Sequence, residues 1–296
     1  MKKILITGKH GQIGHELLQA LAPLGIVCAL DRQQLDLTHP DHIRRVIREI
    51  QPDVIVNAAA YTLVDKAETD EKTALAINAT AVGVLAEEAK KIHALLVHYS
   101  TDYVFDGTKT SPYCEEDVTN PINTYGKSKL EGEKAILTIG CPHLILRTSW
   151  VYGMHGNNFL LTMLRLGKER AELKIVDDQI GAPTWSRLIA EKTADLLSLY
   201  LDKKMNDDLS GIYNLTSAGH TSWLGFSQAI FGLHQQADPT FKAPQLTGIP
   251  SIEYPTPAKR PKFSVLSTNK IHNTFSINMP DWKESLKCCL YSVGFI

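Results

Sequence analysis

The sequence has no excess of charge of either sign and no long apolar run. Its 296 residues include 31 Lys and Arg against 32 Asp and Glu, so it lacks the basic surface that nucleic acids and anionic membranes select. The apolar run that starts at Ile4 ends at Gly8, too early for a signal peptide, and no later run approaches the roughly 18 residues of a membrane span. We therefore expect a cytoplasmic protein whose partners are small molecules, with neither nucleic acid nor membrane among them.

Cysteine and histidine are also not arranged for cross-linking or metal binding. The five cysteines are odd in number and show no paired spacing, so we expect no disulfide framework, as suits a reducing compartment. The 11 histidines form no His-x-x-x-His pattern, and the chain has no Cys-x-x-Cys. The sequence therefore predicts no catalytic metal.

Short β-branched runs alternate with longer segments of helical period over the first half of the chain. Repeated units of this kind predict an α/β protein with a Rossmann-type, doubly wound parallel sheet, which binds ligands beyond the carboxyl ends of its strands. The expected strands are Lys3–Thr7, Val27–Leu30, Val54–Val56, Leu95–His98 and His143–Leu146, and the expected helices are Ile13–Leu24, Asp41–Ile50, Thr73–Lys91 and Thr124–Leu137.

The pattern becomes irregular past Trp150. Prolines between Pro244 and Pro261 exclude a helix or a central strand there. We expect residues 1–176 to form a dinucleotide-binding domain, to which the chain returns around 186–216. Residues 177–296 would then form mainly a smaller C-terminal α/β domain that binds the substrate.

A glycine-rich turn follows the first expected strand. Gly8, Gly11 and Gly14 are spaced three apart, the arrangement typical of short-chain dehydrogenases, and the residues between Gly8 and Gly14 include His10, Gln12 and Ile13. Glycines at this place let backbone N–H groups approach a pyrophosphate, whose charge is favoured at a helix N-terminus. The turn predicts a dinucleotide cofactor.

The ends of the next strands complete this predicted cofactor site. Asp31 can accept hydrogen bonds from the ribose hydroxyls of NADH, whereas Arg32 can pair with the 2′-phosphate of NADPH, so both cofactors stay open. Asp36-Leu37 and the small residues Ala58, Ala59 and Ala60, with Tyr61, leave room for the adenosine and for close backbone contact.

Tyr125 and Lys129 are four positions apart on an expected helix and so face the same side. A phenol is a poor acid unless its anion is stabilised, and an ammonium roughly 4 Å away would contribute on the order of 4 kcal/mol. The true separation is expected to be longer, so a hydroxyl relay or oriented dipoles would also contribute. Thr101, at the end of the fourth expected strand, supplies a hydroxyl for a substrate carbonyl, and the three residues predict a reductase active site.

The chain resembles the dTDP-4-dehydrorhamnose reductases, within the extended short-chain dehydrogenases, over nearly its whole length. The segments that carry this resemblance are Asn57–Ala60, Val64–Glu68, His98–Phe105, Tyr125–Lys127, Arg147–Tyr152, Gly156–Phe159 and Tyr254–Ala258. The resemblance implies reduction of the C4 ketone of dTDP-4-dehydro-L-rhamnose to dTDP-L-rhamnose with NADH or NADPH, the last step in making this sugar nucleotide for cell-surface polysaccharide.

The resemblance also implies a role for each site residue. Tyr125 would donate the proton, Thr101 would tune its transfer, and Lys129 would orient the nicotinamide ribose. The substrate would be bound by Thr101 and Asp102, by Trp150 against the sugar, by Asn158, and by Arg260, whose fork-shaped guanidinium suits the diphosphate.

One position departs from the family pattern. Some members form a dimer around Mg²⁺ bound by glutamates, of which one matches Glu16 and another aligns with Arg187. A cation in place of a carboxylate argues against a shared metal. We expect a metal-independent monomer or weak homodimer.

Three alternatives share parts of the pattern. A sugar-nucleotide dehydratase would need two carboxylates after Thr101, where this chain has Asp102 and then Tyr103. The non-catalytic regulatory subunit of methionine adenosyltransferase keeps the glycines and the Tyr–Lys pair, but Thr101 and Trp150 favour the enzyme. Another nucleotide-sugar reductase or epimerase also stays open.

Overall fold

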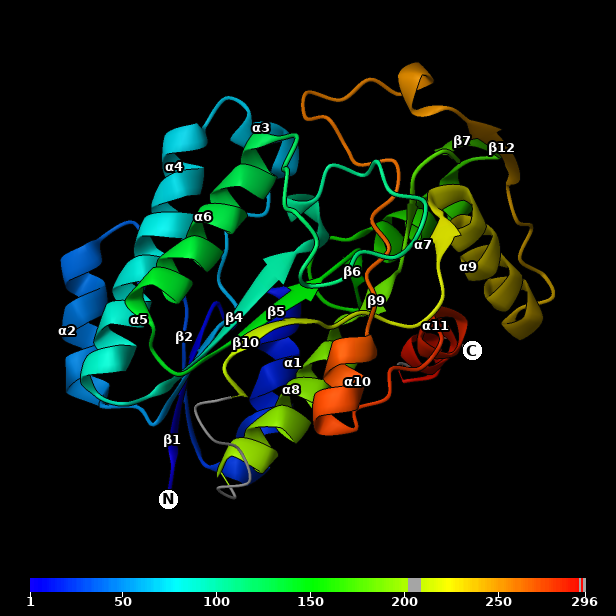
Figure 1. Ribbon diagram of the computed structural model, residues 1–296. Helices are drawn as coiled ribbons and strands as arrows, with labels where there is room; N and C mark the ends of the chain where they lie inside the picture. The colour runs from blue at the N-terminus through cyan, green and yellow to red at the C-terminus, as the bar shows by residue number, and fades with distance from the viewer. Residues whose placement is uncertain (202–208, 293, 295–296) are drawn as a thin grey trace.

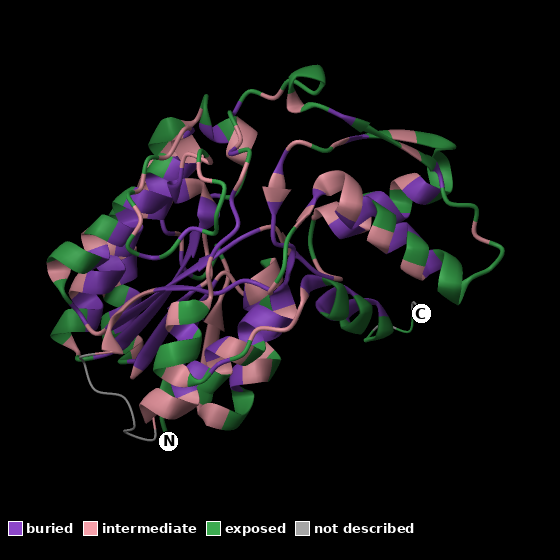
Figure 2. Ribbon diagram, turned by 45° about the vertical axis from the view of Figure 1, so that its right-hand side comes forward, coloured by how far each residue is buried: buried purple, intermediate pink, exposed green. Residues whose placement is uncertain are grey.

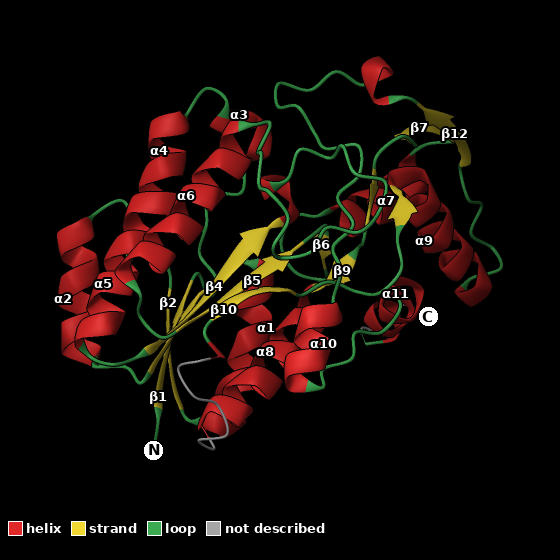
Figure 3. Cartoon of the chain, viewed as in Figure 1, coloured by secondary structure: helices red, strands yellow, loops and turns green. Residues whose placement is uncertain are grey.

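The central feature of the molecule is a six-stranded parallel sheet with the strand order β10-β5-β4-β3-β1-β2. The structure is a computed structural model that describes residues 1–201, 209–292 and 294. The strands are β1 (Lys3–Thr7), β2 (Ile26–Leu30), β3 (Val54–Asn57), β4 (Leu95–Thr101), β5 (His143–Thr148) and β10 (Gly211–Asn214). This order confirms the expected Rossmann-type, doubly wound sheet, drawn in yellow at the centre of Figure 3.

The strands are apolar on both sides because the helices that connect parallel strands cover both faces of the sheet. Successive residues of a strand point to opposite faces, so Ile4 and Ile6 of β1 enter one core while Leu5 enters the other. The two cores appear in Figure 2 as buried strands flanked by helices whose outer surfaces are exposed.

The helices lie in two layers around the sheet (Figure 1). One layer contains α1 (Gln12–Leu21), α8 (Ser186–Leu201) and α10 (Asn269–Phe275), and the other contains α2 (Pro40–Ile50), α4 (Glu71–Leu75), α5 (Ala81–Lys91) and α6 (Thr124–Ile139). The helix expected over Thr73–Lys91 is interrupted, because Ala76–Thr80 forms a π-helical segment between α4 and α5. This segment aims Asn78 at the loop after β3, where it bonds both backbone groups of Tyr61.

A smaller lobe packs beyond the carboxyl ends of the strands. It contains α7 (Phe159–Glu169), β7 (Glu172–Val176), α9 (Trp223–Ala237), β12 (Gln245–Ile249) and α11 (Trp282–Tyr291). In this lobe β7 pairs with β12. Two further pairs of short strands lie beside it: β6 (Val151–Tyr152) with β9 (Thr184–Trp185), and β8 (Ile180–Gly181) with β11 (Thr221–Ser222).

The proline-rich stretch contains no central strand, as predicted, since β12 lies in a two-stranded sheet. The exclusion of any helix there was wrong for one turn, because Ser251–Glu253 forms a 3₁₀ helix just after Pro250. Three residues of 3₁₀ helix tolerate a proline at their N-cap, whose N–H is not needed. Across the described part of the chain, none of the helices combines the length and apolarity that crossing a bilayer requires.

Candidate active site

The glycine turn after β1 brings two backbone segments into close contact. Gly8 has a φ of +74°, and a Cβ there would lie 2.8 Å from Ala59 Cα, while a Cβ on Gly14 would lie 2.1 Å from the Gly8 carbonyl oxygen. Gly11 is the N-cap of α1 and has no side chain to cover the helix amides. The turn therefore fits a pyrophosphate, which needs backbone N–H donors without side chains in the way.

The other predicted residues of the turn have different surroundings. His10 is exposed, and its carbonyl lies 3.0 Å from Nε2 of His155, whose ring stacks on that of His15. Gln12 reaches the Val151 carbonyl of the smaller lobe at 3.5 Å, whereas Ile13 packs into the core on the α1 side of the sheet. The turn thus lies where the two lobes meet.

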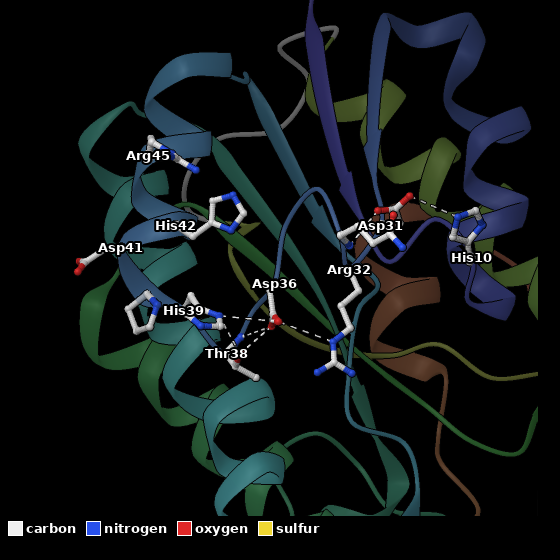
Figure 4. A pocket seen from close by; sticks show the side chains of 11 residues that line it. His10, Asp31, Arg32, Asp36, Thr38, His39, Asp41, His42 and Arg45 are labelled. Atoms are coloured by element: carbon white, nitrogen blue, oxygen red, sulfur yellow. Dashed lines mark hydrogen bonds and ion pairs between the residues drawn. The ribbon is translucent and has the colours of Figure 1, made fainter.

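A cavity of about 1180 Å³ opens beside this turn, at the carboxyl end of β2 (Figure 4). The side chains around it come from the glycine turn, the loop after β2 and the start of α2. They are His10, Asp31, Arg32, Gln33, Asp36, Thr38, His39, Pro40, Asp41, His42 and Arg45. Its position at the carboxyl end of β2 suits the adenosine half of a dinucleotide.

Asp31 is held in this cavity by several donors. Lys9 Nζ lies 3.0 Å and His10 Nε2 lies 3.5 Å from Asp31 Oδ2, and the amides of Gln33 and Gln34 donate to Oδ1. The hydrogen bond from Lys9 is the main cause that lowers the pKa of Asp31 below its ordinary value. Asp31 is therefore an ionised acceptor with a cation beside it.

The remaining predicted residues of this loop separate into exposed and buried ones. Arg32 is largely exposed, with Nε 3.8 Å from Asp36 Oδ2, and is free to turn toward a 2′-phosphate. Asp36 accepts hydrogen bonds from the amide and hydroxyl of Thr38. The Leu37 side chain is buried in the core under α2, so only its backbone is available to a cofactor.

The residues after β3 line the same edge of the sheet. Ala59 packs against Gly8 and donates its amide to Thr7 Oγ1 at 3.2 Å, and Ala58 and Ala60 beside it are half-buried. Tyr61 is buried, with its hydroxyl donating to Asp70 Oδ2 at 3.1 Å. Small side chains here leave space above the ends of β1 and β3.

Two polar residues at the carboxyl end of β4 are buried next to each other. Thr101 Oγ1 donates to Asp102 Oδ1 at 3.0 Å and also accepts the Tyr103 amide at 3.2 Å. Burial raises the pKa of Asp102 to about 7, although hydrogen bonds from Ser264 and Thr101 oppose this change. The carboxyl of Asp102 therefore titrates near neutral pH.

Tyr125 lies in the first turn of α6, where Asn123 is the N-cap and accepts the Gly126 amide at 2.7 Å. Burial raises the pKa of the Tyr125 phenol well above its ordinary value, and a hydrogen bond with Thr101 opposes this change. The nearby Asp102 raises the pKa further, since a negative charge disfavours a phenolate. Tyr125 therefore holds its proton at neutral pH.

Lys129 lies one turn further along α6 and is buried. Its Nζ donates to the Tyr99 carbonyl of β4 at 2.6 Å and lies 3.3 Å from His98 Nε2. Burial lowers the pKa of Lys129 to about 8, with Glu133 opposing. In this structure the lysine is therefore anchored on β4, and it can exist as an ammonium or as a neutral amine near neutral pH.

Trp150 stands at the boundary of the two lobes in a left-handed backbone conformation, with a φ of +46°. Its ring stacks on Trp223 with a centroid separation of 3.5 Å and an interplanar angle of 3°. A Cβ on Gly181 would lie 2.5 Å from the Trp150 ring, so the glycine makes room for it. The half-buried ring forms an aromatic wall on the smaller-lobe side.

The last two predicted substrate residues are occupied by protein partners. Asn158 is the N-cap of α7, accepting the Leu161 amide at 3.1 Å and donating to the Gly153 carbonyl at 2.8 Å. Arg260 Nη2 donates to Asp65 Oδ2 at 2.8 Å. Its Nε is buried and has no hydrogen-bond partner among the described residues, so this guanidinium keeps an unused donor.

The expected departure at the metal position takes the form of an ion pair. Arg187 Nε lies 3.0 Å from Glu16 Oε2. The guanidinium thus binds the carboxylate that would otherwise be available to a cation.

Several residues around the site were missed at the sequence level. His39, His42 and Arg45 line the cavity, and Lys9 binds Asp31 at its edge. Only Lys9, inside the glycine turn, carried a usable signal, because that turn must face Asp31. Trp223 and Asp65 contact predicted residues from distant parts of the chain.

Comparison with known proteins agrees with this geometry. The family model for the RmlD substrate binding domain matches residues 1–294. The dTDP-4-dehydrorhamnose reductase of Burkholderia thailandensis is 49% identical over 291 residues, covering 97% of this chain and 98% of that protein. The dTDP-4-dehydrorhamnose reductase of Escherichia coli K12 is 45% identical over 288 residues, covering 96% and 95%.

A solved structure shows the same likeness in three dimensions. The dTDP-4-dehydrorhamnose reductase of Bacillus anthracis in complex with NADP has a TM-score of 0.87 and 36% identity. The match covers 98% of this chain and 99% of that one.

Proposed function

This chain belongs to the family of the dTDP-4-dehydrorhamnose reductases, and we propose that it carries out its reaction with Tyr125, Thr101 and Lys129. It is an NAD(P)H-dependent oxidoreductase of the last step of dTDP-L-rhamnose synthesis. The observation that carries the residue assignment is that α6 places Lys129 Nζ 2.6 Å from the Tyr99 carbonyl of β4 and Tyr125 beside Thr101 at the end of the same strand.

Bound NADH or NADPH supplies the hydride that reduces the ketone. The glycine turn, Asp31 and the loop after β3 would hold this cofactor along the carboxyl edge of the sheet. Asp31 would accept a ribose hydroxyl of NADH, and Arg32 with Lys9 would face the 2′-phosphate of NADPH.

Tyr125 provides the proton for the C4 oxygen. Because its pKa is raised, the phenol is fully protonated before reaction, and it gives up the proton only to a stronger base such as the developing alkoxide. Thr101 contacts Tyr125, and its hydroxyl would turn from Asp102 to donate its hydrogen to the same substrate oxygen. Lys129 orients the cofactor ribose from its anchor on Tyr99.

The substrate would lie between the two lobes. Trp150 supports the sugar ring, Asp102 lies beside the reacting carbonyl, and Arg260 reaches the diphosphate by exchanging Asp65 for it. Asn158 acts through the loop that it caps. The division at residues 176 and 177, with a return at 186–216, remains our prediction for how the chain is shared between the two sites.

We also propose a cytoplasmic enzyme that is a monomer or weak homodimer without bridging Mg²⁺. The five cysteines are all free, which suits a reducing compartment. The Glu16–Arg187 pair leaves little negative charge for a shared metal.

The test is turnover of purified protein with dTDP-4-dehydro-L-rhamnose and either cofactor, followed by loss of cofactor absorbance. Wild type should turn over, and Tyr125→Phe should lower kcat by at least about 100-fold while the Kd for NADPH changes little, because only the proton donor is removed. A folded wild type that binds NADPH without turnover would favour the regulatory-subunit alternative. Near-normal turnover of the variant would mean that another acid protonates the substrate.

A further inference from the structure

A histidine that the proposed mechanism does not use lies beside the active-site lysine. His98, on β4, is fully buried. Its Nε2 is 3.3 Å from Lys129 Nζ, and its Nδ1 is 3.0 Å from Asn57 Nδ2. Burial, with the nearby Lys129, lowers the pKa of His98 well below its ordinary value. The imidazole is therefore neutral and carries a single N–H, on one nitrogen or the other.

The far end of the hydrogen-bond chain indicates which nitrogen carries it. Thr7 Oγ1 accepts the Ala59 amide and lies 2.6 Å from an oxygen of Asn57, Oδ1. That separation is usual for O–H···O and shorter than the roughly 2.7–3.2 Å of N–H···O bonds, so the Asn57 oxygen faces Thr7. The amide nitrogen of Asn57 then donates to His98 Nδ1, which leaves the imidazole proton on Nε2, facing Lys129.

This tautomer discriminates between the two forms of Lys129. An ammonium has only donors and would oppose the Nε2–H, whereas a neutral amine has a lone pair that accepts it. The 2.6 Å bond to the Tyr99 carbonyl uses one N–H of either form. The longer 3.3 Å separation from His98 fits a contact that is good in one protonation state and poor in the other.

The other ionisable groups around Lys129 do not replace this contact. Glu133, one turn along α6, raises the pKa of Lys129, but its carboxylate is bound by Arg147 of β5 through two bonds of 2.9 and 2.7 Å. Tyr125 lies one turn back and is neutral. Among these groups, His98 is therefore the one whose hydrogen bond to Lys129 depends on whether the lysine is charged or neutral.

We propose that His98 is a positioning residue of this reductase: its Nε2–H, fixed by Asn57, bonds and stabilises the amine left when Lys129 gives up a proton. The proposal rests on the proposed function of Tyr125 and Lys129. A lysine that alternates between ammonium and amine can restore the Tyr125 phenol after each turnover: the ammonium loses one proton, the phenolate gains it, and water then returns a proton to the amine. His98 stays neutral throughout.

The first test reads the tautomer directly and needs no turnover. Full-length enzyme labelled with ¹⁵N-histidine is compared with His98→Phe to assign the ring resonances. We expect a neutral His98 with Nε2 protonated and Nδ1 unprotonated from pH 6 to 9. A proton on Nδ1 overturns the proposal, even if the enzyme is active.

The second test uses matched variants. In a plot of kcat against pH, His98→Phe should raise the pKa that Lys129 sets by roughly 0.5–1 pH unit. This is the equivalent of one lost hydrogen bond to the neutral amine. It should also lower kcat about 10-fold while the KM for the sugar nucleotide changes less than about two-fold. His98→Gln, whose amide N–H can replace Nε2–H, should recover most of both effects.

His143→Phe is the control, because it removes another buried imidazole, the first residue of β5, whose Nδ1 faces the Cys141 carbonyl and not Lys129. It should leave the pH profile unchanged. The proposal is overturned if the pKa set by Lys129 is unchanged or lowered in His98→Phe, or if it changes equally in His143→Phe. If the enzyme has no turnover, the same change is followed from the ¹⁵N resonance of the Lys129 amine, so the two proposals fail separately.

Discussion

Replacing Asp102 by Asn should make the protein more stable, and more so as the pH rises. Asp102 is 2% exposed, and burial raises its pKa from 3.8 to about 7. A raised pKa means that the folded state holds the proton more tightly than the unfolded state does. The stability that this proton contributes is therefore complete below the unfolded pKa and is lost as the pH rises through the folded one.

The size of the effect follows from these two pKa values. A difference of one between the folded and unfolded pKa corresponds to about 1.4 kcal/mol. Relative to a group that does not ionise, Asp102 therefore lowers the free energy of unfolding by roughly 4 kcal/mol at pH 8 and roughly 1.5 kcal/mol at pH 5. Asn cannot ionise and avoids this cost at every pH. The stability difference between Asp102→Asn and wild type should thus grow by roughly 2–3 kcal/mol from pH 5 to pH 8.

Urea unfolding of both proteins at pH 5, 6, 7 and 8, without cofactor, measures this difference. Asp106→Asn provides a control of opposite sign on the same segment, because hydrogen bonds from Thr108 lower the pKa of Asp106 to about 2. Replacing the ionised Asp106 carboxylate should therefore lower the free energy of unfolding at neutral pH. A stability difference for Asp102→Asn that stays flat with pH would refute the reasoning, since it would mean that the carboxyl is not titrating in the folded site.

Three further outcomes follow from the site. Gly14→Ala should abolish NADPH binding in a fluorescence titration, because the new Cβ would lie 2.1 Å from the Gly8 carbonyl oxygen; normal affinity would mean that the turn is free to open. Trp223→Leu should raise the KM for the sugar nucleotide several-fold with little change in kcat, because Trp150 loses its stacking partner, and unchanged kinetics would remove Trp150 from the substrate wall. Glu133→Leu should destabilise the fold by about 3–5 kcal/mol in urea, since Arg147 would be left buried without its carboxylate, and a loss below about 1 kcal/mol would contradict this.

The sheet could be predicted because parallel strands buried on both faces are nearly continuous apolar runs. The ends of β4 and β5 could not, because these strands run three and two residues past the predicted His98 and Leu146, through polar residues. These polar residues belong to the active site. Their polarity therefore indicated function, but it also ended the apolar pattern from which the strands were predicted. The π-helical segment at Ala76–Thr80 also escaped, since five residues inside a longer helical stretch carry no separate signal.

Local motifs placed the glycine turn, Thr101, Tyr125 and Lys129 at one edge of the sheet, as the structure has them. Contacts between segments that are far apart in the sequence could not be predicted from such motifs. Asp65 and Arg260 are 195 positions apart, and nothing in either motif signals that they pair. The tautomer-dependent contact of His98 likewise depends on three strands and a helix meeting, which no spacing encodes.

The last strand of the main sheet has a consequence for how the chain folds during synthesis. β10 contributes only Gly211–Asn214, but it covers the edge of β5, and α8 and α10 cover the apolar surface beside α1. A nascent chain that has emerged only to residue 176 would therefore carry an open strand edge and a bare apolar face, both of which favour association with other chains. The cofactor half reaches a closed state only after most of the polypeptide has left the ribosome.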